Sequence, residues 1–228
     1  GQWAEEIAGY EEPNDAFAAG DFSGLGSDPE YVVHPPLGKW LIGLGVLLFG
    51  PDSGWGWRFS VAMAGVATVG VTMRIGWLLS RSLWVGCLTG LFLALDGVHI
   101  VLSRVSLLDG FLTLFVALGA LFVVKDWLAT GWARSSAVVW RRPWLVATGV
   151  AFGAAAAIKW SGLYPFAGFL ALLTIGDLLR RTGRSRLVRN EDHQAPKHHP
   201  FWGTIAQAAV TAAIALPVAF VTYLASWI

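Results

Sequence analysis

The sequence VVHPPLGKW at residues 32–40 decides the fold. Two consecutive prolines fix two φ angles and remove two backbone donors, so we expect His34 in an extended conformation and a helix beginning at the second proline. The apolar run behind it, residues 37–49, is about 13 residues long, whereas a membrane span needs roughly 20. The stretch predicts an interfacial helix over residues 35–50 that presents His34 and Lys39 at a membrane surface. An ordinary helix cap before an amphipathic helix is the alternative.

The composition indicates an all-α, multi-pass integral membrane protein. Hydrophobic residues make up 55% of the 228 residues and charged residues 14%, whereas soluble proteins carry about 25% charged residues. The mean hydropathy is +0.58. A net charge of +1 and the lack of basic stretches interleaved with aromatics exclude a nucleic-acid partner. The single cysteine, Cys87, lies in an apolar run and reads as a small buried hydrophobe, so we expect no disulfide framework.

Further apolar runs predict a transmembrane bundle over residues 57–228. We expect about five spans, at 57–79, 83–102, 107–128, a hairpin of two helices over 144–179 turned at Ser161 and Gly162, and 203–227. Gly149, Gly153 and Ala157 recur at a spacing of four, which favours close helix packing in lipid.

Two polar segments flank or interrupt the bundle. Residues 1–34 are rich in acids, glycine and proline and predict a loop, with a short helix at Trp3–Tyr10. Residues 180–200 predict a polar linker. Its histidines, His193, His198 and His199, are either a metal tract or, the better interpretation, part of a solvated loop, so we expect no metal site.

The basic residues predict the orientation. When the spans alternate, twelve basic residues fall on one side and four on the other, which makes the first side cytoplasmic. The linker at 180–200 is then cytoplasmic, and residues 1–34 and 35–50 are extracytoplasmic. The four basic residues of the extracytoplasmic side are Lys39, Arg58, Arg104 and Lys159.

The charges within or beside the spans gather on that extracytoplasmic face. Asp96, His99 and Asp109 join the four basic residues there, and charges in spans are costly and usually functional. Arg104 and Asp109 flank one turn, so a structural ion pair between them is an alternative, as is stabilisation of Asp109 by a helix dipole. Four converging cations instead predict an anionic ligand such as a phosphate or pyrophosphate. We expect a short loop to bring Lys39 and Arg58 together.

Four motifs carry a resemblance to a known family. They read HPPLGKW at 34–40, GWRFSVA at 56–62, SRVSLLDGFLT at 103–113 and AIKWSGLY at 157–164. In this order the chain resembles, from about residue 31 onward, the N-terminal part of the protein O-mannosyltransferases, with the actinobacterial branch nearest. The HPP element alone is weak, because related aminoarabinose transferases also carry a Pro-Pro element before a juxtamembrane helix.

The resemblance implies an integral membrane glycosyltransferase of the GT-C type. Such enzymes move mannose from a polyprenyl-phosphate carrier to Ser or Thr hydroxyls of secreted proteins, at the extracytoplasmic face of the cell membrane. A carboxylate acts as base while basic groups hold the phosphate that leaves. The residues that match family motifs are His34, Pro35, Pro36, Lys39, Arg58, Arg104 and Asp109, with less defined roles for Lys159 and Trp160.

One family feature lies outside these motifs. The catalytic acid of the family belongs to an Asp-Glu pair after the first span, which we expect upstream of Gly1, so no catalytic residue is assigned and the chain is expected to be an inactive fragment. The pairs Glu5–Glu6 and Glu11–Glu12 lack the aromatic context of that pair.

The expected partners are the lipid donor, a secreted protein acceptor, the secretion translocon and membrane lipid, and no cofactor is expected. The alternatives are a related transferase that acts on lipid or a cell-wall polymer, and a transporter or structural membrane protein.

Overall fold

The computed structural model describes residues 9, 15–16, 19–21, 23–24, 33–130, 138–182 and 200–228. The regular elements there are helices, and no strand occurs among the described residues: α2 (Leu37–Phe49), α3 (Gly54–Ser80), α4 (Leu83–Leu95), α5 (Gly97–Leu102), α6 (Leu108–Thr130), α7 (Pro143–Ile158), the 3₁₀ turn η1 (Trp160–Gly162), α8 (Leu163–Arg181) and α9 (Pro200–Ala225). The expected all-α fold is therefore confirmed. Apart from Gly9, the helix expected at Trp3–Tyr10 lies outside the described residues, as do the histidines of the 180–200 linker.

Four helical segments are long and apolar enough to cross a membrane. They are Gly54–Ser80, Leu108–Thr130, Trp160–Arg181 and Pro200–Ala225, while α2, α4 and α7 are shorter apolar helices. Such segments need a hydrocarbon environment for their apolar surface. The chain is thus a membrane protein, as its composition predicts.

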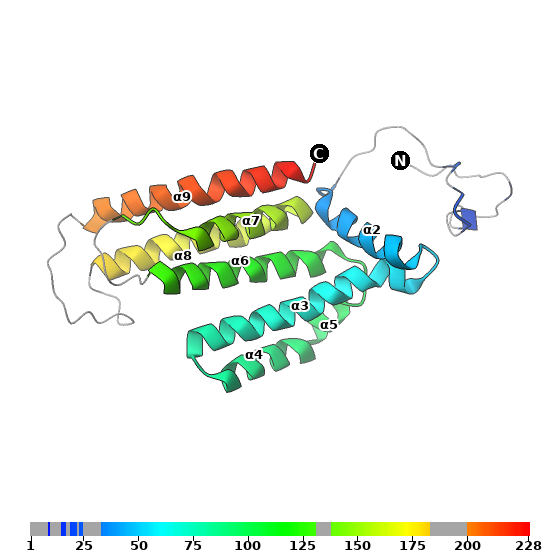
Figure 1. Ribbon diagram of the computed structural model, residues 1–228, viewed down its shortest axis with the longest axis horizontal. Coiled ribbons are helices and arrows are strands. Elements are labelled where there is room, and N and C mark those ends of the chain that lie inside the picture. Colours follow the sequence, from blue (N-terminus) through cyan, green and yellow to red (C-terminus); the bar gives the residue numbers. More distant parts are fainter. Residues whose placement is uncertain are drawn as a thin grey trace.

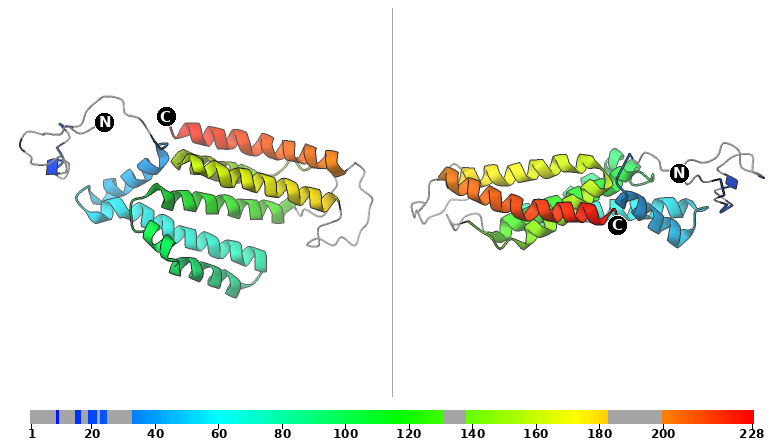
Figure 2. Two further views of the ribbon diagram at one scale, coloured as in Figure 1. Left: turned by 180° about the vertical axis from the view of Figure 1, so that it is seen from behind. Right: turned by 90° about the horizontal axis from the view of Figure 1, so that it is seen from above.

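The long helices run side by side, and the chain alternates in direction along them (Figures 1 and 2). Helix α7 packs between α6 and α9, α3 packs between α4 and α6, and α8 packs against α9. Helix α2 lies oblique to the others at one end of the bundle, where the chain also ends (Figure 1). We call this the α2 end, formed by residues 34–58, 103–109, 158–164 and 223–228. The opposite, basic end is formed by residues 80–84, 125–130, 138–144, 177–182 and 200–207.

Helix α2 begins one residue after the second proline, which the sequence predicted as its first residue. Pro36 occupies the cap position, and the first helical residue is Leu37. The helix ends at Gly50, which adopts a positive φ of 80°, a conformation that glycine reaches without steric cost. Ser53 then caps α3 by accepting a hydrogen bond from the backbone N–H of Trp55 (3.2 Å). The short turn folds α2 back against the start of α3.

The segment expected as one helix over residues 83–102 is divided in the structure. Helix α4 ends at Leu95, Asp96 has an extended backbone (ψ 123°), and α5 begins at Gly97. The Asp96 carboxylate accepts a hydrogen bond from the backbone N–H of His99 (2.8 Å). An aspartate that caps the following residues competes with continuation of the helix, and the next residue, Gly97, has a low helix propensity. Apolar length alone does not reveal this break.

Small residues let α7 and α9 approach closely, as their spacing predicts. All residues from Ala151 to Ile158 are buried. A Cβ at Gly149 would lie 2.8 Å from the carbonyl oxygen of Ala215, and one at Gly153 would lie 2.5 Å from that of Ala219. The α7–α9 contact therefore fixes where the end of α7 projects its next residue, Lys159.

Candidate functional site

An ion pair between α6 and the end of α7 lies at the centre of the α2 end. Lys159 has an extended backbone between α7 and η1, and its Nζ donates to Oδ1 of Asp109 at 2.9 Å. The two side chains are 35% and 38% exposed. Asp109 lies in the first turn of α6, where the helix dipole favours a carboxylate. The pair joins two motifs that are 50 residues apart in the sequence.

The partner of Asp109 differs from the alternative that the sequence suggests. Arg104 lies in an exposed turn before α6, whereas Asp109 pairs with Lys159. The ion pair is determined by the packing of α6 against α7, which places Lys159 beside the first turn of α6. The sequence favoured Arg104 as the partner of Asp109 because the two residues are close along the chain, whereas Lys159 comes near only through folding.

The HPP element reaches the same region. A Cβ at Gly38 would lie 2.6 Å from the Leu108 side chain and 3.2 Å from that of Ile158, and these two residues directly precede Asp109 and Lys159. Lys39 is therefore in the turn of α2 that packs beside the ion pair. His34 is half-buried and Pro35 is buried just before this helix. Three of the four sequence motifs thus meet at one place.

Arg58 lies apart from Lys39, contrary to expectation. Helices α2 and α3 are joined by a tight turn, and the ring of Phe49 packs on that of Phe59 with centroids 4.8 Å apart. Lys39 is ten residues before Phe49, which corresponds to about 15 Å along the helix. The Arg58 guanidinium lies near Gly54, where a Cβ would be 3.8 Å from Nη1. The hairpin places Arg58 at the turn and Lys39 at the far end of α2.

Arg58 and Arg104 instead belong to a second group at the α2 end. The Ser106 hydroxyl donates to the carbonyl oxygen of Trp57, which ties the turn that carries Arg104 to the residue before Arg58. Both arginines are exposed. The structure thus arranges the predicted cations as two groups, one around the Asp109–Lys159 pair and one around the Ser106–Trp57 contact.

His99 is engaged by the neighbouring helix. Its Nε2 donates to the carbonyl oxygen of Gly65 at 3.2 Å, and Ser103 lies against the same glycine. The side chain therefore holds α5 to α3. Asp96 is the cap of α5, as described above.

Aromatic residues of η1 and of the C-terminal end of the described chain extend the first group. The indole Nε1 of Trp160 donates to the hydroxyl of Tyr223 at 3.3 Å, and the Tyr223 ring contacts that of Trp227 edge-on at 6.2 Å. Sequence reasoning missed Tyr223, because it lies in a terminal apolar helix without charges. Its position near the end of a span, where interfacial aromatics concentrate, is the signal that was available.

The basic end contains a buried ion pair that sequence reasoning also missed. Arg142 donates from Nη2 to Oδ2 of Asp126 at 2.5 Å and from Nη1 to the Thr211 hydroxyl at 2.6 Å. The side chains of Arg142 and Asp126 are only 6% and 1% exposed. In the sequence, Arg142 counts only as one of the twelve basic residues of the expected cytoplasmic side. The aspartate inside an apolar run, Asp126, was the available signal.

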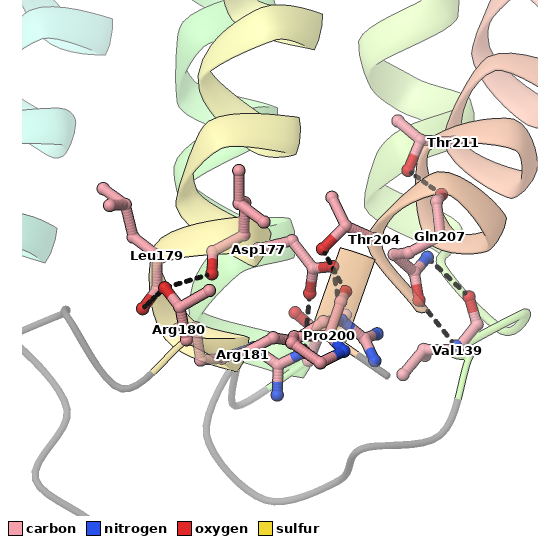
Figure 3. Close-up of polar contacts among 12 residues, drawn as sticks. Val139, Asp177, Leu179, Arg180, Arg181, Pro200, Thr204, Gln207 and Thr211 are labelled. Atoms are coloured by element: carbon pink, nitrogen blue, oxygen red, sulfur yellow. Dashed lines mark hydrogen bonds and ion pairs between the residues drawn. The ribbon is translucent and has the colours of Figure 1, made fainter. Parts of the chain in front are cut away.

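Helices α8 and α9 are tied together at the same end (Figure 3). Asp177 accepts from Arg180 Nη2 and Arg181 Nε, each at 2.6 Å, and the Arg181 guanidinium lies against Gly203 of α9. The Gln207 side-chain amide exchanges two hydrogen bonds with the backbone of Val139, at 2.8 and 3.2 Å. These contacts fix the helices that deliver Lys159 and Tyr223 to the opposite end.

Comparisons with known proteins assign the chain to a family. The family described as dolichyl-phosphate-mannose-protein mannosyltransferase matches residues 51–228. A polyprenol-phosphate-mannose–protein mannosyltransferase of Mycobacterium tuberculosis (strain H37Rv) is 39% identical over 220 residues, which cover 90% of this chain and 40% of that protein. The protein with the same name from Mycolicibacterium smegmatis is 36% identical over 223 residues, with the same coverage.

A third relative with that name, from Corynebacterium glutamicum, is 36% identical over 161 residues, or 64% of this chain and 31% of that protein. The chain therefore spans about two fifths or less of the length of these relatives. No solved structure matches the chain.

Proposed function

The chain belongs to the dolichyl-phosphate-mannose-protein mannosyltransferase family, and on that premise we propose that it takes part in transferring mannose from a polyprenyl-phosphate-mannose lipid to Ser and Thr hydroxyls of secreted proteins. One observation carries the proposal. The motifs at 34–40, 103–113 and 157–164, which are far apart in the sequence, converge on the Asp109–Lys159 pair at the α2 end. A helical bundle that needed these residues only for packing would not require charged groups at the meeting point.

The proposed role of the cations is to hold the phosphate of the lipid carrier. Transfer of the sugar leaves negative charge on that phosphate, and nearby cations stabilise the developing charge. Lys159 and Lys39 supply positive charge in the first group, and Arg58 and Arg104 supply it in the second. Asp109 holds Lys159 in position through its 2.9 Å contact. His34 positions the substrate or supports the HPP segment, and the catalytic base is not assigned to a described residue.

The proposed location of this site is the extracytoplasmic face of the cell membrane. The turns at the basic end carry Arg81, Arg141, Arg180 and Arg181, and basic residues concentrate on the cytoplasmic side of membrane proteins. The α2 end then faces the compartment through which secreted acceptors pass, close to the secretion translocon. A lipid-linked donor reaches the site from the surrounding leaflet.

Substitution of the second cation group tests the role in transfer. In the full-length protein, Arg58→Ala and Arg104→Ala are each expected to lower mannose transfer by about 10²-fold, the typical effect of losing one group that stabilises developing charge. The measurement is mannosylation of a Ser/Thr acceptor peptide from polyprenyl-phosphate-mannose. Arg81→Ala, which removes an exposed arginine at the basic end, is the control and should retain activity. Near-normal turnover in both variants would refute the proposed role.

A further inference from the structure

The connection between α5 and α6 runs past the start of α3 (Figure 1), and it is anchored to that helix at both of its ends. Ser103, directly after α5, packs so closely on Gly65 that a Cβ there would overlap the serine side chain. Gly110, in the first turn of α6, lies against Val61, whose side chain a Cβ would approach to 2.6 Å. Gly65, Val61 and Gly110 are all buried. Residues 104–107 therefore form a short loop between two fixed ends.

Ser106 attaches this loop to the start of α3. Its hydroxyl donates a hydrogen bond to the carbonyl oxygen of Trp57, which lies 49 positions away in the sequence. The indole Nε1 of Trp57 donates in turn to the carbonyl oxygen of Pro51 at 2.6 Å. The two hydrogen bonds link the loop, the start of α3 and the turn between α2 and α3.

The two arginines of the second cation group lie beside this contact in the sequence. Arg104 is two residues before Ser106, and Arg58 directly follows Trp57. Both arginines are exposed, and Arg104 belongs to a loop, the part of a protein that is usually more mobile than the elements it connects. Two cations hold one phosphate only when their separation suits it, and a misplacement of about 1 Å can lower a reaction rate about 10²-fold. The position of the Arg104 backbone relative to α3 depends on the Ser106 hydroxyl.

We propose that Ser106 is a positioning residue of the transfer reaction, which holds Arg104 at the distance from Arg58 that the phosphate of the lipid donor requires. The serine acts through Arg104 and needs no contact with the substrate. A hydroxyl just before a helix commonly accepts a hydrogen bond from a backbone N–H of that helix. The Ser106 hydroxyl instead donates to a different helix. The role rests on the function proposed above for the two arginines.

A double-mutant cycle in the full-length protein tests this role, with kcat/KM for polyprenyl-phosphate-mannose and a Ser/Thr acceptor peptide as the measurement. Ser106→Ala should lower kcat/KM by about five- to tenfold, the effect of losing one neutral hydrogen bond. Ser106→Thr keeps the hydroxyl and should restore most of the activity. In the Arg104→Ala background, Ser106→Ala should cause no further loss, because the side chain that it positions is absent. The same loss in both backgrounds would overturn the proposal.

Spin labelling follows the loop independently of activity. Val105, next to Arg104, is 39% exposed and accepts a nitroxide label as Val105→Cys in a protein whose native cysteines are replaced. The label should become more mobile in Ser106→Ala and return to its original mobility in Ser106→Thr. Unchanged mobility in Ser106→Ala would contradict the positioning role even if transfer falls.

Ser80→Ala is the matched control. The exposed Ser80 hydroxyl also donates to a carbonyl oxygen of α3, that of Gly76 at 2.7 Å, but at the basic end. Its removal should leave transfer and label mobility unchanged. Normal transfer by Arg104→Ala would refute the proposed function of the cations and, with it, the role of Ser106. Lowered transfer by Arg104→Ala together with normal transfer by Ser106→Ala would refute the positioning role alone.

Discussion

Two aspartates of α6 show how the environment of a residue decides its role. Asp109 and Asp126 lie at opposite ends of the helix, and each pairs with a cation of the segment around α7. The Asp109–Lys159 pair is about one third exposed, whereas the Asp126–Arg142 pair is almost fully buried. Exposed pairs contribute little to stability, whereas breaking a buried pair leaves an uncompensated charge. The first pair is therefore available for a ligand, and the second fixes the fold.

This contrast predicts different costs for the same substitution. Asp126→Asn keeps the shape of the side chain but leaves Arg142 buried without its counter-charge, so we expect a loss of about 3–5 kcal/mol in the free energy of unfolding. Asp109→Asn should cost less than about 1 kcal/mol, because Lys159 remains accessible to solvent. Thermal unfolding of both variants in the same detergent provides the comparison. Equal losses would show that burial does not separate the two pairs.

The sequence predicted the first of these aspartates and missed the second for a physical reason. Asp109 stands in a motif at the start of a span, so the sequence alone marks it as a candidate site residue. The role of Asp126 follows only from the folded structure, in which Arg142 binds both Asp126 and the Thr211 hydroxyl of α9. Such a partnership depends on three-dimensional packing. The choice of Lys159 over Arg104 as the partner of Asp109 escaped prediction for the same reason.

Among the elements, the sequence predicted a helix boundary well where a local backbone constraint, such as a proline, determines it without tertiary contacts. The two prolines predicted a helix start at Pro36, one residue before the observed start at Leu37, and small residues at a spacing of four indicated close packing of α7 without identifying α9 as its partner. The break at Asp96 was missed, because an apolar run of suitable length conceals a cap that interrupts it. The separation of Lys39 from Arg58 was missed because the length of α2 carries its two ends apart.

Two glycines with different surroundings, Gly153 at the α7–α9 contact and Gly168 on an open face of α8, predict opposite effects of substitution by alanine. A Cβ at Gly153 would meet backbone atoms of Ala219 at 2.5 and 2.8 Å, so Gly153→Ala forces the helices apart and should destabilise the protein by about 1–3 kcal/mol. Gly168 of α8 has open space around it, and Gly168→Ala should stabilise by about 0.5–1 kcal/mol through its higher helix propensity. Thermal unfolding in detergent measures both. Stabilisation by Gly153→Ala would contradict the close approach of α7 and α9.

At the scale of the whole molecule, the alternating direction of the helices places the charged residues in two groups, one at each end of the bundle. The α2 end collects the motifs that the family resemblance highlighted, while the basic end collects arginines, several of which are engaged with buried carboxylates. Counting basic residues predicted this separation without any knowledge of contacts. It did not reveal that Arg142, Arg180 and Arg181 have structural partners, because a count treats every basic residue as a solvated one.

The proposed orientation makes a prediction for cells that express the full-length protein with its native cysteines replaced. Asp52 lies in the exposed turn between α2 and α3, and Arg141 is exposed just before α7 at the basic end. If the α2 end faces outward as proposed, a membrane-impermeant maleimide should label Asp52→Cys in intact cells and should label Arg141→Cys only after permeabilisation. Cys87→Ala removes the cysteine inside α4 from the background. The reverse labelling pattern would place the converging motifs on the cytoplasmic side, where no secreted acceptor passes, and the proposed transfer reaction would lose its substrate.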